Sequence, residues 1–325
     1  MIVALVLIGY SVLLAVVGPR LLLRAEWVDR APRLGIAAWQ ALTVTVLASV
    51  VMAGLALTVP TVQISGDLAA LLRSCVMALR EQYASPWGAA AGVAGAIFAL
   101  AIIGRFLWFL GAAITRMVRE RTRHGSVLDM VGRRDAGRGI VILECDDPAV
   151  YCLPGRHRRI VVTTAALRAL DEDQLDAVLA HERAHLGERH DLVLALATAL
   201  ATAFSGLKVF GQAAAETARL VELRADDVAA ERTNRLTVAG ALLAVAATGT
   251  LHRIPAVALA AGGAGAAARV RRLLPPHNPL SRLRAATGSL AVALLLALPV
   301  LVLGSPAVAS MQHSMCPDAP MSSQM

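Results

Sequence analysis

Four long apolar segments constrain the fold of this chain more than any other feature. They occupy residues 2–17, 36–59, 89–114 and 288–304 of 325. A membrane-spanning helix needs about 20 apolar residues, which the second and third segments supply plainly and the two shorter ones approach. Apolar residues make up 57% of the sequence and charged residues 17%, whereas soluble domains average roughly 45–50% and about 25%. The sequence therefore predicts an α-helical multi-pass membrane protein rather than a soluble one.

Arginine placement predicts how these segments are oriented. Basic residues cluster after the first segment, after the third and before the fourth, whereas loop 60–87 holds only Arg73 and Arg80. Because cytoplasmic loops are enriched in Lys and Arg, we expect both termini to lie outside the plasma membrane and residues 115–286 to be cytoplasmic. The predicted organisation is residues 1–114 with three spans and an outer loop at 60–87, a cytoplasmic domain at 115–286, a fourth span at 287–304 and an outer tail at 305–325.

The four cysteines divide according to this topology. Cys75 and Cys316 are expected outside, where a disulfide can persist, and Cys145 and Cys152 inside, where thiols stay reduced.

The cytoplasmic segment combines short strands with helices. Apolar stretches at 140–144, 149–153 and 159–163 are separated by turn residues and predict a small antiparallel sheet. Asp171 followed by Gln174 three residues later resembles a capping box and predicts a helix over 172–188. The domain is therefore expected to be an α+β insertion between the third and fourth spans.

A His-Glu-x-x-His motif on that predicted helix carries the candidate chemistry. His181 and His185 are four residues apart, so both imidazoles lie on one helix face and can bind one Zn²⁺ ion. Glu182 lies beside them, where it can accept a proton from a metal-bound water. The alternative interpretation is a solvated helix face that carries two histidines by chance. Only eight histidines occur in the chain, which makes that coincidence uncommon.

The third metal ligand is expected from a later helix. His190 follows the motif. However, it does not lie at the distance from His185 at which a third histidine ligand is found in longer motifs of this kind. Glu222 is the better candidate, because Asp226 lies four residues further on the same helix face. Glu222 would bind the metal, and Asp226 would accept the N–H of a ligand histidine and fix its tautomer.

The position of Glu222 also bears on two further apolar stretches. If residues 192–207 crossed the membrane once, Glu222 would lie on the opposite side from His181. We therefore expect a buried helix of the peptidase or one that rests on the membrane. Residues 236–268 are interrupted by Arg253 and Pro255, and a re-entrant pair remains the alternative there.

At this point the sequence resembles a known group of proteins. Residues 151–191, which end in HERAHLGERHD, resemble the strand–helix–HExxH unit of gluzincin membrane peptidases, and the downstream motif is ELRAD. With three spans before the peptidase and one after it, the whole chain is similar to the BlaR/MecR family of antibiotic-sensing membrane metallopeptidases. The resemblance implies zinc bound by His181, His185 and Glu222, with Glu182 catalytic.

The same resemblance implies a partner and shows one departure. The family's peptidase is linked to cleavage of a cytoplasmic winged-helix repressor, so a protein substrate is expected, with no direct binding of nucleic acid by this chain. The family carries an extracellular penicillin-binding domain after the fourth span, and here only residues 305–325 follow. We therefore expect sensing by loop 60–87 or by a partner.

The expected reaction is hydrolysis of a peptide bond, with Glu182 transferring the proton. We expect an extended substrate to pair with an exposed edge strand at 159–163. Candidate donors to the oxyanion are His190, His157 and Arg219. The alternative functions are a non-enzymatic zinc-binding receptor or scaffold, and a transporter. The intact Glu182 argues against the first, and spans without ionisable residues apart from Arg105 argue against the second.

Overall fold

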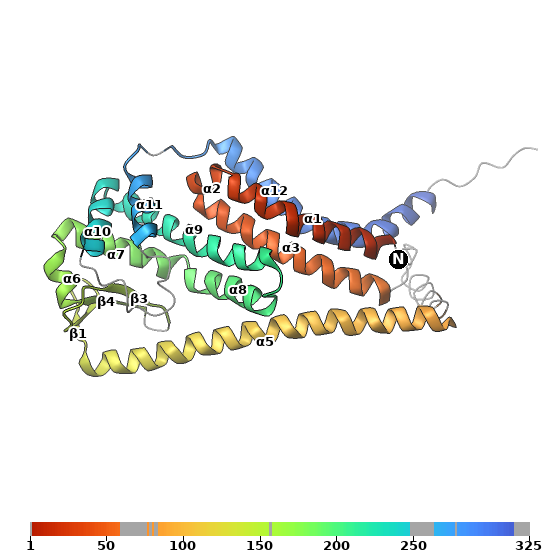
Figure 1. Cartoon of the computed structure of the whole chain (residues 1–325), viewed down its shortest axis with the longest axis horizontal. Helices are drawn as coiled ribbons and strands as arrows, with labels where there is room; N and C mark the ends of the chain where they lie inside the picture. Colours follow the sequence, from red (N-terminus) through yellow and green to blue (C-terminus); the bar gives the residue numbers. More distant parts are fainter. Residues whose placement is uncertain are drawn as a thin grey trace, which may run out of the picture. The chain divides into compact units, whose positions relative to one another are not determined.

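Two compact units make up the structure, and each is described separately (Figure 1). The computed structural model describes residues 2–58, 77, 80, 84–155, 158–247, 263–276 and 278–314. The first unit comprises Met1–Leu21, Ala41–Phe106 and Ser289–Met325, and the second comprises Leu22–Gln40 and Leu107–Gly288.

The first unit is built from apolar helices. They are α1 (Ile2–Arg24), most of α3 (Pro32–Thr58), the first part of α5 (Pro86–Val131) and most of α12 (Arg282–Ser314). Ser11 of α1 donates a hydrogen bond to the Val46 carbonyl of α3 at 3.1 Å. Where α3 meets α5, a Cβ on Gly95 would lie 2.5 Å from the Gly54 carbonyl oxygen. Glycine is therefore required at this crossing, because only backbone fits between the two helices.

Four helices in the described part of the chain are long and apolar enough to cross a membrane. They are Ile2–Arg24, Pro32–Thr58, Pro86–Val131 and Arg282–Leu303, and each contains one of the predicted apolar segments. Helix α5 continues well beyond the predicted end at residue 114. Its 46 residues span roughly 70 Å, more than twice the ~30 Å thickness of a bilayer core.

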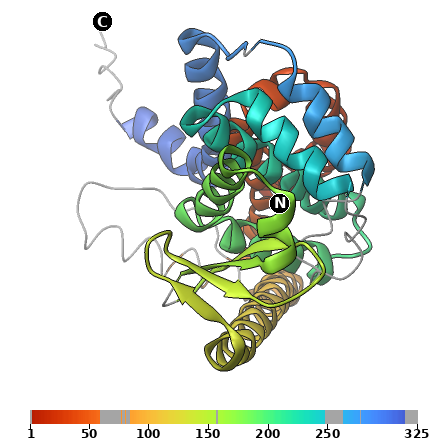
Figure 2. The ribbon, with the colours of Figure 1, turned by 90° about the vertical axis from the view of Figure 1, so that its left-hand side faces the viewer.

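The second unit contains a four-stranded sheet (Figure 2). The strands β1 (Arg133–Asp135), β2 (Ile140–Leu143), β3 (Val150–Leu153) and β4 (Arg159–Thr163) are ordered β1-β2-β4-β3. The three predicted strands are confirmed, but the prediction of a purely antiparallel sheet is wrong, because β2 and β4 pair in parallel. Strand β4 pairs with β3 as a hairpin on one side, and its other side is taken by β2 in parallel, so that Val161 and Val162 of the central strand are fully buried.

Helices cover both faces of this sheet. Successive side chains of a strand point to opposite faces of the sheet. Val141 and Val161 lie on one face, where they pack with Leu128 near the end of α5. The other face packs against α6 (Thr164–Ala169), α7 (Glu172–Gly187) and α10 (Arg235–Ala247). Residues Leu175 and Leu179 fix α7 on this apolar layer.

Helix α7 begins as the sequence predicted. Asp171 accepts a hydrogen bond from the Gln174 backbone N–H at 2.8 Å, and the Gln174 side chain accepts one from the Asp171 N–H at 3.3 Å, which completes a capping box. Two backbone donors at the helix start are thereby paired, and the register of the His-Glu-x-x-His face is fixed.

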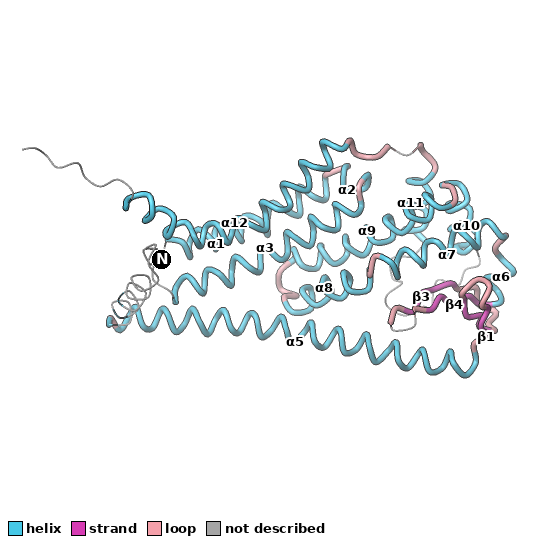
Figure 3. Tube along the Cα trace, turned by 180° about the vertical axis from the view of Figure 1, so that it is seen from behind, coloured by secondary structure: helices cyan, strands magenta, loops and turns pink. Residues whose placement is uncertain are grey.

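The remaining helices complete the second unit: α2 (Trp27–Arg30), α8 (His190–Ala203), α9 (Lys208–Arg232) and α11 (Gly263–Leu273) (Figure 3). Helix α8 covers most of the apolar stretch 192–207 and has 14 residues, about 21 Å, which is short for a span. It packs along α9, as expected for a helix of the peptidase. Of the stretch 236–268, residues 236–247 belong to α10 and 263–268 to α11, and the re-entrant alternative depends on residues 248–262, which lie outside the described residues.

Candidate metal centre

The candidate centre lies where α7 packs against α9. Small residues occupy this interface: Ala177 and Ala180 of α7 and Ala229 of α9 are all buried in one apolar cluster. Alanines allow two helix backbones to approach closely, so that longer side chains one turn away can meet. His181 and His185 extend from α7 towards Glu222 of α9.

The side chains of His181, His185 and Glu222 form the three corners of a ligand triangle. The Nε2 atoms of His181 and His185 are 3.0 Å apart, and they lie 3.5 and 3.6 Å from the two carboxylate oxygens of Glu222. A tetrahedral Zn²⁺ ion with bonds of about 2.0–2.1 Å separates neighbouring ligand atoms by about 3.3 Å. The side chains therefore fit one zinc ion and would supply three protein ligands.

In both histidines, a neighbouring side chain contacts Nδ1, the ring nitrogen that does not face the other ligand atoms. The Nδ1 atom of His181 lies 3.1 Å from Asp226 Oδ1, and the Nδ1 atom of His185 lies 3.0 Å from His190 Nδ1. Each contact directs the Nε2 atom towards the triangle, which is how metal-ligating histidines are commonly held. Asp226 is therefore close enough to accept the Nδ1–H of His181. His190 contacts the side of His185 that faces away from the ligand atoms, so the structure supports neither a ligand role nor an oxyanion role for it.

Arg269 of α11 is a member of the site that sequence reasoning missed. Its guanidinium group donates to both oxygens of Asp226, at 2.7 and 2.6 Å, and lies 3.0 Å from Glu222 Oε2. The Arg269 side chain is only 8% exposed, and a charge buried this deeply requires paired partners. In the sequence, Arg269 is one of several arginines that precede the fourth apolar segment. No sequence motif links it to Asp226, which lies 43 residues earlier.

Two basic side chains, His181 and Arg269, face the carboxylates of Glu222 and Asp226. Burial opposes charge on every group here, but hydrogen bonds from His181 and Arg269 hold the pKa values of Glu222 and Asp226 below their usual range. Burial would lower the pKa of His181, yet its hydrogen bonds to Asp226 and Glu222 raise it to about 10. Burial and the nearby His181 lower the pKa of His185 to about 3. Protonated His181 and Arg269 thus neutralise two carboxylates, and a metal ion must displace the His181 proton.

Glu182 lies outside the ligand triangle, as expected for a proton-transfer group. It hydrogen-bonds to the side chain and backbone of Cys152 on β3, and burial raises its pKa. Burial and Glu182 also raise the pKa of the Cys152 thiol, so Cys152 remains a neutral partner. A raised carboxylate pKa brings a base closer to the neutral range, where proton transfer is most efficient.

Two other predictions for the site change with the structure. Arg219 forms ion pairs at 2.8 Å with both Asp29 and Glu216, so its charge is already compensated. The third oxyanion candidate, His157, lies outside the described residues. The prediction that a substrate pairs with the strand at 159–163 is wrong, because β4 lies between β2 and β3, and β3 is the edge beside α7.

Two histidines one helical turn apart, a glutamate beside the first and a second glutamate that closes the triangle define a helix-borne metallopeptidase site. The model of peptidase family M48 matches residues 119–288, a little over half of the chain, and the chain belongs to this family. Family M48 peptidases are metal-dependent and generally use zinc. Comparisons with curated proteins and with solved structures found no match.

The metal-free protein is expected to lose thermal stability as the pH rises from about 6.5 to about 10. Folded His181 keeps its proton up to about 10, whereas an ordinary histidine with a pKa of 6.5 loses it earlier. The folded state then binds more protons, so its stability is fully present below 6.5 and declines above it. Melting temperatures of chelator-treated protein across this range would measure the decline.

Two variants separate the contribution of His181 from a general loss of stability at alkaline pH. His181→Gln should flatten the profile, whereas His124→Gln, at an exposed histidine of α5, should keep it. A metal-free protein whose melting temperature stays level or rises over this interval would contradict the charge assignment.

Proposed function

We propose that this family M48 protein is a membrane-embedded zinc metalloendopeptidase of gluzincin type. His181, His185 and Glu222 would bind zinc, and Glu182 would act as the general base. The observation that carries the proposal is the closeness of the ligand atoms: the two Nε2 atoms lie 3.0 Å apart, and each lies 3.5 or 3.6 Å from one of the two carboxylate oxygens of Glu222.

The chain's own residues would divide the work of hydrolysis. When bound, zinc would polarise the scissile carbonyl and lower the pKa of a bound water towards about 7. Glu182 would take a proton from that water and pass it to the leaving amine. Asp226 and His190 would keep the two imidazoles in the tautomers that present Nε2. Arg269 would hold Glu222 and Asp226 in place by charged hydrogen bonds.

The substrate would be a protein segment in extended form. Strand β3 (Val150–Leu153) pairs only with β4 within the described residues, which leaves its other edge for a further strand. Cys152 of this strand contacts Glu182, so a chain paired there would pass beside the catalytic base. This arrangement supports β3 in place of the 159–163 strand expected from the sequence.

The biological role that we propose is signalling by proteolysis. The order of three long apolar helices, a peptidase segment and one more long apolar helix is the feature that this chain shares with BlaR/MecR peptidases, although the family match itself is to M48. The substrate would then be a cytoplasmic protein such as a winged-helix repressor, with the chain anchored in the plasma membrane. A zinc-binding receptor or scaffold without turnover is the competing function.

Glu182→Gln should keep about one zinc ion per chain but lower hydrolysis of a protein substrate by roughly 10²- to 10⁴-fold, because it removes the proton acceptor and no ligand. The assay would combine zinc analysis of detergent-purified protein with cleavage of labelled casein. Glu231→Gln, at an exposed glutamate of α9, is the matched control and should change neither value. Zinc binding without cleavage in the unaltered chain would favour the scaffold.

The proposed topology places both termini outside and residues 115–286 in the cytoplasm. An impermeant thiol reagent on intact, mildly reduced cells should label Cys75 and Cys316, which lie outside the described residues, and spare Cys145 and Cys152. Cys145 is the better inner probe, because burial raises the pKa of the Cys152 thiol and slows its reaction. A variant with Cys145 as its sole cysteine should react only after permeabilisation. Labelling of this variant on intact cells would contradict the proposed topology.

A further inference from the structure

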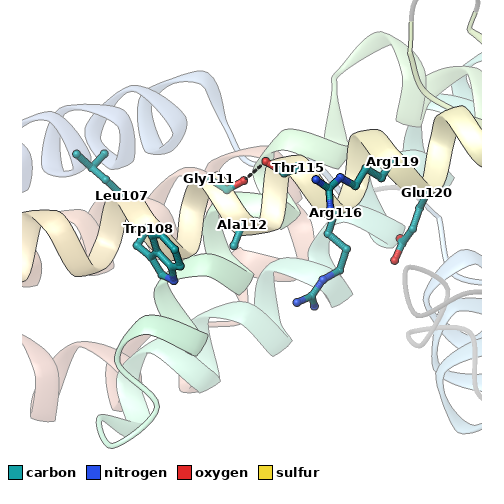
Figure 4. A pocket seen from close by; sticks show the side chains of 8 residues that line it. All are labelled: Leu107, Trp108, Gly111, Ala112, Thr115, Arg116, Arg119 and Glu120. Carbon is teal, nitrogen blue, oxygen red and sulfur yellow. Dashed lines mark hydrogen bonds between the residues drawn. The ribbon is translucent and has the colours of Figure 1, made fainter.

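One stretch of α5, from Leu107 to Glu120, lies outside the peptidase chemistry. Figure 4 shows side chains of this stretch, all on the one helix, which together form an open surface. Its first half is largely apolar, with Leu107, Trp108, Gly111 and Ala112, and its second half is charged, with Arg116, Arg119 and Glu120. The surface therefore changes from apolar to basic along the helix axis.

The basic residues follow one face of the helix. At 100° per residue, Trp108, Ala112, Arg116, Arg119 and Arg123 fall within about one quarter of the helix circumference. All five are exposed, and the Trp108 side chain is 75% exposed. Arg121, which points elsewhere, pairs with Asp191 at 2.9 Å. Among the described residues, no ion-pair partner is found for Arg116, Arg119 or Arg123.

The position along the chain indicates what this face contacts. Trp108 belongs to the apolar stretch of α5, whereas Arg116 follows it by eight residues, about 12 Å along the axis. An exposed tryptophan followed by arginines is the arrangement expected at a membrane–water interface. Unpaired guanidinium groups at that depth match the phosphate of a lipid headgroup, and the apolar half matches its acyl chains.

We infer that this face of α5 is a binding site for an anionic phospholipid. The phosphate would lie between Arg116 and Arg119, and an acyl chain would run along Trp108 and Ala112. Glu120 reduces the local positive charge and so limits the affinity. The inference rests on the proposed membrane embedding of α5, but it is independent of the zinc site.

Trp108 supplies a direct readout, because bromine on a lipid chain quenches tryptophan fluorescence on contact. The full-length protein would be placed in vesicles containing either brominated phosphatidylglycerol or brominated phosphatidylcholine at equal mole fraction. The chain has four tryptophans, so the Trp108 contribution is the difference between the protein and its Trp108→Phe variant. We expect phosphatidylglycerol to quench this contribution more strongly.

Charge variants test the site itself. Arg116→Gln combined with Arg119→Gln should lower the preference for phosphatidylglycerol by roughly tenfold. Glu120→Gln, a matched change of opposite sign, should maintain or increase it. Soluble glycerol phosphate should not compete, because it lacks the acyl chain.

The results that would contradict this proposal can be told apart from those that would contradict the membrane embedding. Equal quenching by the two lipids, or a preference that survives loss of both arginines, would overturn the lipid site while leaving the membrane embedding intact. Absence of quenching by either lipid would overturn both. Competition by glycerol phosphate would overturn the lipid as ligand and indicate a site for a soluble phosphate.

Discussion

The buried ion pair between Arg269 and Asp226 is the interaction on which the rest of the centre depends. It neutralises a carboxylate that is fully buried, and the same guanidinium group contacts the ligand Glu222. Removing one partner of such a pair leaves an uncompensated buried charge and costs about 3–5 kcal/mol. Helix α11 is thereby tied to α9, and Asp226 in turn orients His181 on α7. The ligand geometry is thus set by charged contacts among three helices.

The parts of this centre that follow local rules could be predicted from the sequence. Spacing of four residues brings His181 to His185 and Glu222 to Asp226, because an α-helix repeats every 3.6 residues. The Asp171–Gln174 capping box is also local, and it correctly located the start of α7. Glu222 was the expected third ligand because Asp226 follows it on the same helix face, and the structure brings the side chains of Glu222 and His181 together.

The parts that depend on distant packing could not be predicted. Arg269 resembles any other arginine near a membrane segment until α11 packs against α9. The central position of β4 depends on how the β3–β4 hairpin is placed beside β2, which alternation of polar and apolar residues does not specify. The contact between His190 and His185 could not be predicted either, because it depends on how the chain turns between α7 and α8. Arg189, which has a φ of 54°, lies in this turn and caps the start of α8.

The most direct test of the central claim is zinc K-edge X-ray absorption on the zinc-loaded, full-length protein. The account predicts a coordination shell of two imidazole nitrogens and at least one carboxylate oxygen at about 2.0–2.1 Å, with no sulfur. Cys152 makes the test stringent, because its thiol contacts Glu182 beside the ligands. A sulfur scatterer at about 2.3 Å, or a shell with fewer than two imidazoles, would contradict the assignment of His181, His185 and Glu222 as the metal site.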